Sequence, residues 1–120
     1  MSLLDTTQLS LEAAMRGSML QQSLLTNNLA NVDTPGYQQE TVNFQGALQS
    51  ALQSGQSPSS VQFSPTTEPG TTSADGNGTD SEQDSAEIAE NGLLYQDLTQ
   101  VAAAREQILI TAIGPTGAAS

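Results

Sequence analysis

Carboxylates are the side chains of this sequence with the greatest capacity for chemistry, and they gather in its second half. Asp75 and Asp80 flank a stretch of Gly and Asn, and four further acidic residues follow closely. These are Glu82, Asp84, Glu87 and Glu90. Paired carboxylates can act as general acid and base, and alternating oxygen ligands can hold calcium. The stretch therefore raises two possibilities, an acid–base site and a calcium loop.

Neither possibility has the residues that its chemistry requires. Counted from Asp75, position 6 of a calcium loop is Asp80, where the sharp turn needs Gly, and position 12 is Ala86, where a bidentate Glu is needed. An acid–base site lacks a second catalytic group, because the sequence contains no His and no Cys. Negative charge is favourable in the first turns of a helix. We therefore expect a solvated turn that leads into a helix, with no catalytic, cofactor-binding or metal-binding residue.

Composition excludes further functions. The 120 residues leave room for one domain at most, and two Phe, two Tyr and no Trp supply little bulk for a core. Thirteen acidic residues face only Arg16 and Arg105, and the net charge of -11 repels phosphate, so nucleic acid is not expected as a partner. No small-molecule substrate is expected either. No apolar run approaches the roughly 18 residues of a membrane span, and the basic start of a cleaved secretory signal is missing.

Two long amphipathic helices are predicted, one at each end. The first runs from about Thr6 to Val32 and stops at residues 33–36, because proline disfavours helical geometry in the residue before it. The second runs from about Asp80 to Ile113, and we expect Gly114-Pro115 to end it. Steps of three or four residues place the following side chains on the packing faces: Leu11, Met15, Leu25 and Leu29 in the first helix, and Leu94, Leu98, Val101, Ile108 and Ala112 in the second.

The middle of the chain has a different composition. Residues 49–79 consist mostly of Ser, Thr, Gly, Pro and Gln, which bury too little to offset the entropy of ordering them. Residues 37–43 should be extended, and the spacing of Phe44, Ala47, Leu48, Ala51 and Leu52 predicts a short third helix. The predicted fold is mainly α, with the terminal helices paired as a coiled-coil-like hairpin around a flexible polar middle. Its parts are residues 1–37, a largely irregular segment 38–79, the helix 80–113 and a disordered tail 114–120.

A helical hairpin of this kind is marginal on its own, because most helix stability comes from tertiary packing. Each helix also carries a second, patchier apolar face. Its members are Leu9, Leu20 and Leu24 in the first helix, and Leu93, Ile110 and Ile113 in the second. Such a pair is suited to a bundle or tube of many chains, where neighbours cover the remaining apolar surface.

The residues from Asn27 to Tyr37 make an unusual helix stop. Its three Asn are poor helix formers, so we expect them to form hydrogen bonds at the helix end. Pro35-Gly36 suits the centre of a type II turn, where Gly accepts positive φ, and Tyr37 could anchor the chain beyond it. This string resembles the N-terminal motif shared by the axial proteins of the bacterial flagellum, the rod, hook and hook-associated subunits. The resemblance implies an assembly motif made of Asn27, Asn28, Asn31, Thr34, Pro35, Gly36 and Tyr37.

The C-terminal half is similar to one group among these proteins, the FlgB family of the proximal rod. The matching positions are Asp80, Ala89, Glu90, Asn91, Leu93, Tyr95, Leu98, Thr99, Gln100, Leu109, Thr111, Ala112 and Ile113. The resemblance implies a non-enzymatic structural subunit that polymerises through its terminal helices and is needed for flagellum assembly and motility. The implied partners are other copies, other rod and membrane-ring-junction proteins, and the type III export apparatus. The implied location is the periplasmic rod, reached without a cleaved signal peptide.

The sequence departs from the family pattern, and a second class of function stays open. The family usually carries additional basic residues in the C-terminal helix, whereas this sequence has only Arg105 there, which puts the expected salt bridges between subunits in doubt. A soluble acidic hairpin that offers its apolar face to a single protein partner would share the same periodicity. An adaptor of that kind is the alternative to a rod subunit.

Overall fold

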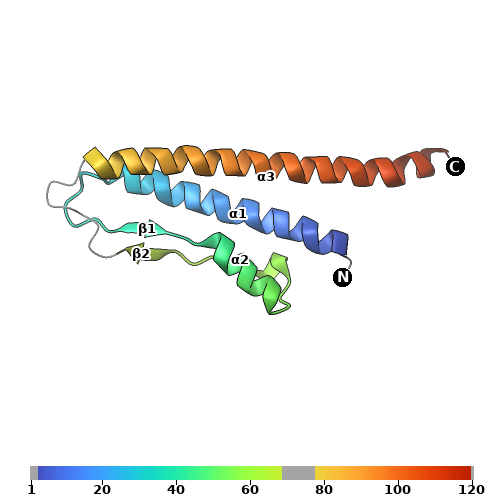
Figure 1. Ribbon diagram of the computed structural model, residues 1–120, viewed down its shortest axis with the longest axis horizontal. Coiled ribbons are helices and arrows are strands. Elements are labelled where there is room, and N and C mark those ends of the chain that lie inside the picture. The colour runs from blue at the N-terminus through green and yellow to red at the C-terminus, as the bar shows by residue number, and fades with distance from the viewer. Residues whose placement is uncertain (1–2, 69–77, 120) are drawn as a thin grey trace.

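The computed structural model describes residues 3–68 and 78–119. Its elements are α1 (Leu3–Ala30), β1 (Gln39–Thr41), α2 (Phe44–Gln53), the 3-10 helix η1 (Pro58–Ser60), β2 (Thr66–Glu68) and α3 (Gly78–Ala119). The molecule is elongated, 69 × 28 × 14 Å, and α1 and α3 lie side by side in opposite directions along it (Figure 1). Long terminal helices and a short third helix confirm the predicted, mainly helical fold class.

Helix α1 is the central element. Helix α3 packs on one side of it, and α2, η1 and β1 pack on the other side (Figure 1). At about 1.5 Å per residue, the 28 residues of α1 span about 42 Å and the 42 residues of α3 about 63 Å. Helix α3 therefore continues well past the N-terminal end of α1, as Figure 1 shows. No helix in the described part of the chain combines the length and apolarity of a membrane span.

Small and polar residues occupy the contact between α1 and α3. Ser18 is fully buried, and Asn91 of α3 donates from Nδ2 to the Ser18 carbonyl oxygen (2.7 Å) and to Gln22 Oε1 (2.9 Å). Ala102, eleven residues after Asn91 in α3, is also buried. The pairing therefore combines close approach of the helices with one buried amide that is fully used as a donor.

Two residues of the predicted packing face of α3 are largely exposed in the single chain. Val101 is 48% exposed and Ile108 is 66% exposed. Among the described side chains of α3, the buried positions are Asp84, Asn91 and Ala102. Of the other predicted residues, Leu25 is buried, the side chain of Ala112 lies outside the described residues, and these are half-buried: Leu11, Met15, Leu29, Leu94 and Leu98.

Glycine permits the contact between α1 and α2. A Cβ added at Gly17 would collide with the Cβ of Phe44, so the first residue of α2 sits directly on the α1 backbone. Phe44 is 4% exposed, and its ring meets that of Phe63 edge-on, with centroids 6.3 Å apart. The N-cap of α2 is Asn43, whose Oδ1 accepts the Gly46 N–H (3.0 Å).

The segment between the long helices contains more structure than its composition indicates. The predicted extended segment 37–43 contains β1, and the predicted third helix is α2. In contrast, η1 and β2 fall within residues 49–79, which the sequence predicts to be flexible. Strands β1 and β2 pair antiparallel, with Gln39 opposite Glu68 and Thr41 opposite Thr66. Residues 69–77 of this range lie outside the described residues.

Arg16 connects the second part of this segment to α1. Its two terminal nitrogens donate to the carbonyl oxygens of Val61 (3.3 Å) and Pro58 (3.2 Å), and its guanidinium carbon lies 5.6 Å from the centre of the Phe63 ring. Pro58 and Val61 are buried beside it. One cation thus supplies the order that a polar, proline-containing segment lacks by itself.

Both long helices exceed their predicted bounds. Helix α1 begins at Leu3 and not near Thr6. Thr6 lies inside the helix, where its carbonyl oxygen accepts a hydrogen bond from Ser10 Oγ (2.8 Å). Helix α3 runs to Ala119, past the predicted end at Gly114-Pro115 and through most of the predicted disordered tail. Proline removes a single backbone donor from a helix, at a cost of about 3 kcal/mol, and a long helix can continue beyond it.

Gly17→Ala should destabilise the chain, because the added methyl group would collide with Phe44 and force α2 away from α1. We expect a loss of about 1–3 kcal/mol in the free energy of unfolding, the usual cost of overpacking. The measurement is urea unfolding followed by circular dichroism. The matched control is Gly92→Ala, whose new Cβ would meet its nearest neighbour, Gln22 Nε2, at an ordinary 3.9 Å. Equal unfolding midpoints for the two variants would contradict the assigned role of Gly17.

Candidate functional site

Hydrogen bonds from Asn31 terminate α1. The Asn31 backbone N–H donates to the carbonyl oxygen of Asn27 (3.1 Å), and the Asn31 side chain donates to the same oxygen from Nδ2 (2.9 Å). One carbonyl of the last helical turn therefore accepts two hydrogen bonds from one residue. Such side-chain bonds compete with continued helix and end it locally.

A turn follows at Thr34 to Tyr37. Thr34 bonds back to Asn31 twice, from its backbone N–H (2.9 Å) and from its hydroxyl to Oδ1 (3.2 Å). The Tyr37 N–H then closes the turn on the Thr34 carbonyl oxygen (3.2 Å), and Gly36 has φ of +76°. Pro35 and Gly36 thus occupy the central positions of a type II turn, as the sequence predicts, because only Gly adopts that φ without strain.

The side chain of Tyr37 folds back onto the last turn of α1. Its hydroxyl accepts a hydrogen bond from Asn27 Nδ2 (2.8 Å) and donates one to Asn28 Oδ1 (3.2 Å). The aromatic side chain thereby spans the turn and fixes the direction in which the chain leaves it. This is the anchoring role that the sequence predicts for Tyr37.

Asn28 binds the backbone of β1 in the manner of a neighbouring strand. Its Oδ1 accepts the Glu40 N–H (3.0 Å), its Nδ2 donates to the Glu40 carbonyl oxygen (2.9 Å), and the residue is 1% exposed. Gln21, two helical turns earlier, accepts the Val42 N–H through Oε1 (3.0 Å). We call Asn28 and Gln21 the amide clamp. Strand β1 is paired with β2 along one edge and held by the amide clamp along the other.

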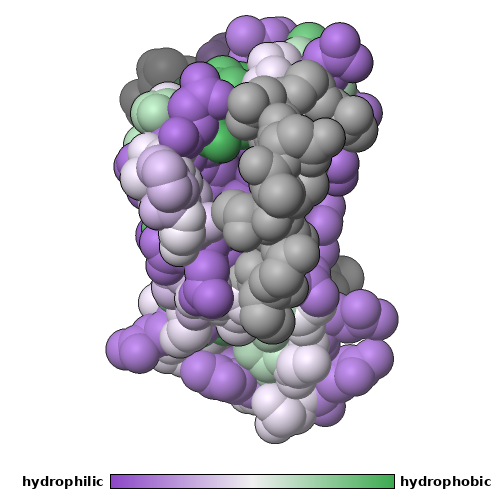
Figure 2. Space-filling view, turned by 90° about the vertical axis from the view of Figure 1, so that its left-hand side faces the viewer, coloured by the Kyte–Doolittle hydropathy of each residue, from purple (hydrophilic) through white to green (hydrophobic). Residues whose placement is uncertain are grey.

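The chemistry of this site is positional. Its side chains are carboxamides and hydroxyls that form hydrogen bonds to backbone groups and to one another. Over the described residues no group of three or more acidic, His or Cys side chains is arranged to hold a metal ion. The view in Figure 2, onto the left-hand end of the molecule in Figure 1, is mainly hydrophilic. What the arrangement can do is set the direction of the middle segment relative to α1.

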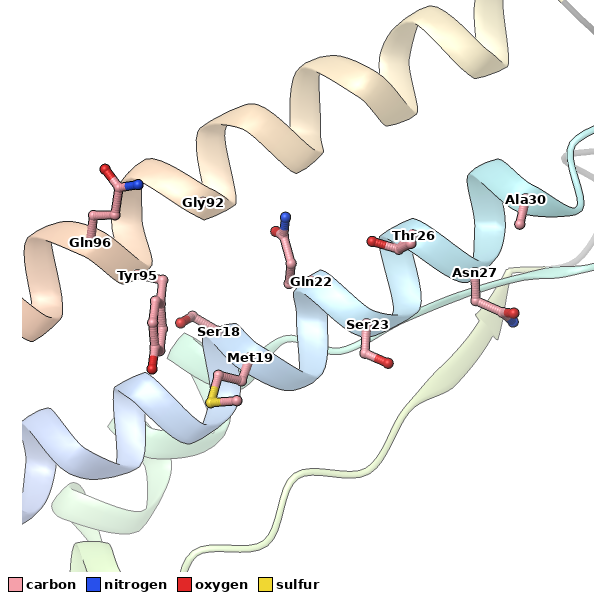
Figure 3. Close-up of a pocket in the computed structure, with 10 residues that line it drawn as sticks. All are labelled: Ser18, Met19, Gln22, Ser23, Thr26, Asn27, Ala30, Gly92, Tyr95 and Gln96. Carbon is pink, nitrogen blue, oxygen red and sulfur yellow. The ribbon is translucent and has the colours of Figure 1, made fainter.

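An open groove lies next to the motif, between α1 and α3 (Figure 3). Its volume is about 730 Å³. Ser18, Met19, Gln22, Ser23, Thr26, Asn27 and Ala30 line it from α1, and Gly92, Tyr95 and Gln96 line it from α3. Tyr95 points from α3 toward α1 beside Met19, and Gln22 points toward the α3 backbone near Gly92, as Figure 3 shows. Asn27 belongs to both the groove and the motif, so the two features meet at one residue.

The structure brings all seven residues of the predicted motif together, and it adds partners that the sequence analysis missed. Gln21 was overlooked because it lies within the helix, although its seven-residue spacing from Asn28 places both amides on one helix face. Asn91 was overlooked as a packing residue because periodicity was sought among apolar side chains alone.

Comparison with known proteins gives consistent matches. The family model described as flagella basal body rod protein matches residues 11–38, which include most of α1 and the whole motif. Over 112 residues the chain is 35% identical to the flagellar basal body rod protein FlgB of Bacillus subtilis strain 168, covering 83% of this chain and 87% of that protein. Over 95 residues it is 33% identical to the FlgB of Escherichia coli strain K12, covering 62% of this chain and 69% of that protein.

Replacing Asn28 by Ala should release β1 from α1. The Glu40 N–H and carbonyl would lose their partner, and a buried group left without a hydrogen bond costs about 1–3 kcal/mol. We expect hydrogen exchange of the Glu40 amide to accelerate by about tenfold or more, since its opening free energy falls by that amount. The matched control is Asn31→Ala, whose side-chain bonds stay within residues 27–34. Unchanged exchange at Glu40 in the Asn28 variant would refute the amide clamp.

Proposed function

Because this chain belongs to the FlgB family of flagellar basal body rod proteins, we propose that it builds the proximal part of the rod by packing its terminal helices against neighbouring subunits. Family membership makes the chain a structural subunit of the flagellar basal body rod, and thereby part of the machinery of motility. A structural family points to a role without catalysis. The rod subunit is accordingly favoured over the single-partner adaptor.

One observation carries the proposal: large apolar side chains of α3 remain exposed in the single chain. Their exposed fractions are 62% for Leu93, 48% for Val101, 66% for Ile108 and 61% for Ile110. Burial of apolar surface gains about 25 cal/mol per Å², so covering these side chains favours association. An exposed apolar surface on an otherwise polar protein marks a contact with another protein.

The arrangement of the helices supports the same proposal. Helix α1 is covered on two sides, by α3 and by the middle segment, whereas α3 packs mainly on α1 and reaches the middle segment near its start, where Asp84 accepts a hydrogen bond from Gln39. By length, α3 exceeds α1 by about 20 Å. Much of α3 is therefore free for neighbours. We infer that other copies and other rod or ring-junction subunits cover it.

The route to the rod follows from the same energetics. A narrow hairpin with few large buried side chains is weakly stable alone, and weak stability favours passage of an unfolded chain through an export channel. We therefore propose that the flagellar type III apparatus exports this subunit, without a cleaved signal peptide, into the periplasm. Assembly there would supply the burial that the single chain lacks.

A concentration series of circular dichroism spectra tests this function. A rod subunit should gain helix as concentration rises, because association buries the exposed apolar side chains of α3. An adaptor of the alternative class should keep constant helicity as a stable monomer or dimer. Sedimentation velocity on the same samples relates each change in helicity to a change in mass. Constant helicity and constant mass over the whole series would contradict assembly through the helices.

Polar substitution of the α3 surface should separate association from folding. The variant Ile108→Ser with Ile110→Ser leaves the α1–α3 contact untouched, since both side chains are more than half exposed. We expect unchanged helicity in dilute solution and weaker association by about tenfold or more, from loss of two apolar contacts of roughly 1–2 kcal/mol each. The control is Gln100→Ser with Gln107→Ser, two exposed polar positions of the same helix. Equal association of both variants would show that the apolar residues do not form the contact.

A further inference from the structure

The contact between α1 and α3 depends on an Asn that is followed by Gly. Asn91 is 9% exposed, and its Nδ2 donates to the Ser18 carbonyl oxygen (2.7 Å) and to Gln22 Oε1 (2.9 Å). The Ser18 carbonyl oxygen can only accept, so this contact requires a donor at position 91. Gly92 lies at the edge of the groove, and Gln22 points toward it (Figure 3).

An Asn-Gly pair carries a chemical liability of its own. The backbone nitrogen of the glycine can attack Cγ of the asparagine, because no Cβ of the following residue obstructs the approach. A new C–N bond closes a succinimide ring, and the side-chain nitrogen leaves as ammonia. Water then opens the ring at one of its two carbonyl carbons and yields aspartate or isoaspartate. The overall reaction consumes one water molecule, releases one ammonia and involves no oxidation.

We propose that Asn91 is a deamidation site controlled by the pairing of α3 with α1. In the paired state the reaction is blocked twice. Gly92 lies within α3, away from both helix ends, where helical geometry keeps its nitrogen away from the side chain of the preceding residue. The carboxamide itself is held by Ser18 and Gln22. In an unpaired, unfolded α3 both restraints are absent and the reaction proceeds.

The product weakens the contact. Either form places a carboxylate where the amide donor stood, facing the Ser18 carbonyl oxygen with no hydrogen to share at neutral pH, and a flip of the Gln22 amide would replace only the other of the two hydrogen bonds. Isoaspartate also adds a main-chain atom and interrupts the helix. Deamidation thus limits the time that a chain can remain unpaired and still form the α1–α3 hairpin. This inference concerns the hairpin itself and is independent of the role in the rod.

The test follows deamidation of the full chain by peptide mass spectrometry at neutral pH, with and without urea. In urea we expect Asn91 to react at a rate comparable to Asn77, which also precedes Gly and serves as the chemical reference. In native buffer, at a concentration where helicity is maximal, Asn91 should react slower than in urea by about tenfold or more, since local opening must come first. Equal rates at Asn91 with and without urea would overturn the proposal.

Two variants separate the chemistry from its consequence. Gly92→Ala should markedly slow the reaction at Asn91 in urea, because the added Cβ hinders the attack on Cγ. The variant should keep native helicity, because that Cβ lies 3.9 Å from Gln22 Nε2. Asn91→Asp should shift the urea midpoint of helix loss to lower concentration, or prevent helix formation altogether. A wild-type midpoint for Asn91→Asp would overturn the claim that the product weakens the pairing. Undiminished deamidation in Gly92→Ala would overturn the proposed mechanism.

Discussion

The course of the chain after α1 depends on one buried carboxamide, that of Asn28. A backbone strand that runs beside a helix has no regular partner for its outward N–H and C=O groups, and leaving them unpaired next to protein is costly. Asn28 supplies both a donor and an acceptor to Glu40, and Gln21 supplies a second acceptor at Val42. With these groups satisfied, β1 can lie on α1, and only then can α2 begin on the bare backbone at Gly17.

Buried polar residues set the geometry of this chain, whereas much of the apolar surface that could stabilise it lies outside. The buried positions include Ser18, Asn28, Asp84 and Asn91, which contribute directed hydrogen bonds and little apolar area. Asp84 illustrates this at the start of α3, where its Oδ2 accepts a hydrogen bond from Gln39 of β1 (3.1 Å). Several large apolar side chains are left on the outside of α3. The single chain therefore has a defined shape and modest stability, a combination that suits a subunit completed by its neighbours.

Sequence reasoning recovered the parts of this structure that local rules determine. The type II turn followed from Pro35-Gly36, the extended segment and third helix followed from periodicity, and the resemblance of Asn27 to Tyr37 identified the motif. Long-range polar contacts were not predictable in the same way. The bonds from Asn28 to Glu40 and from Asn91 to Ser18 need a known chain path, and Arg16 binds carbonyls more than 40 residues away. Such contacts depend on which polar groups the fold brings together.

The distribution of charge along α3 explains how an acidic protein can still associate with itself. A net charge of -11 opposes contact between copies, and screening at physiological salt acts over about 8 Å. Five of the thirteen acidic residues lie in residues 80–90, at the start of α3. From residue 91 to 119 only Asp97 and Glu106 remain, and Arg105 offsets one of them. The exposed apolar residues of α3 all lie in this nearly neutral part, so the surface that gains most from association is also the one where repulsion is weakest.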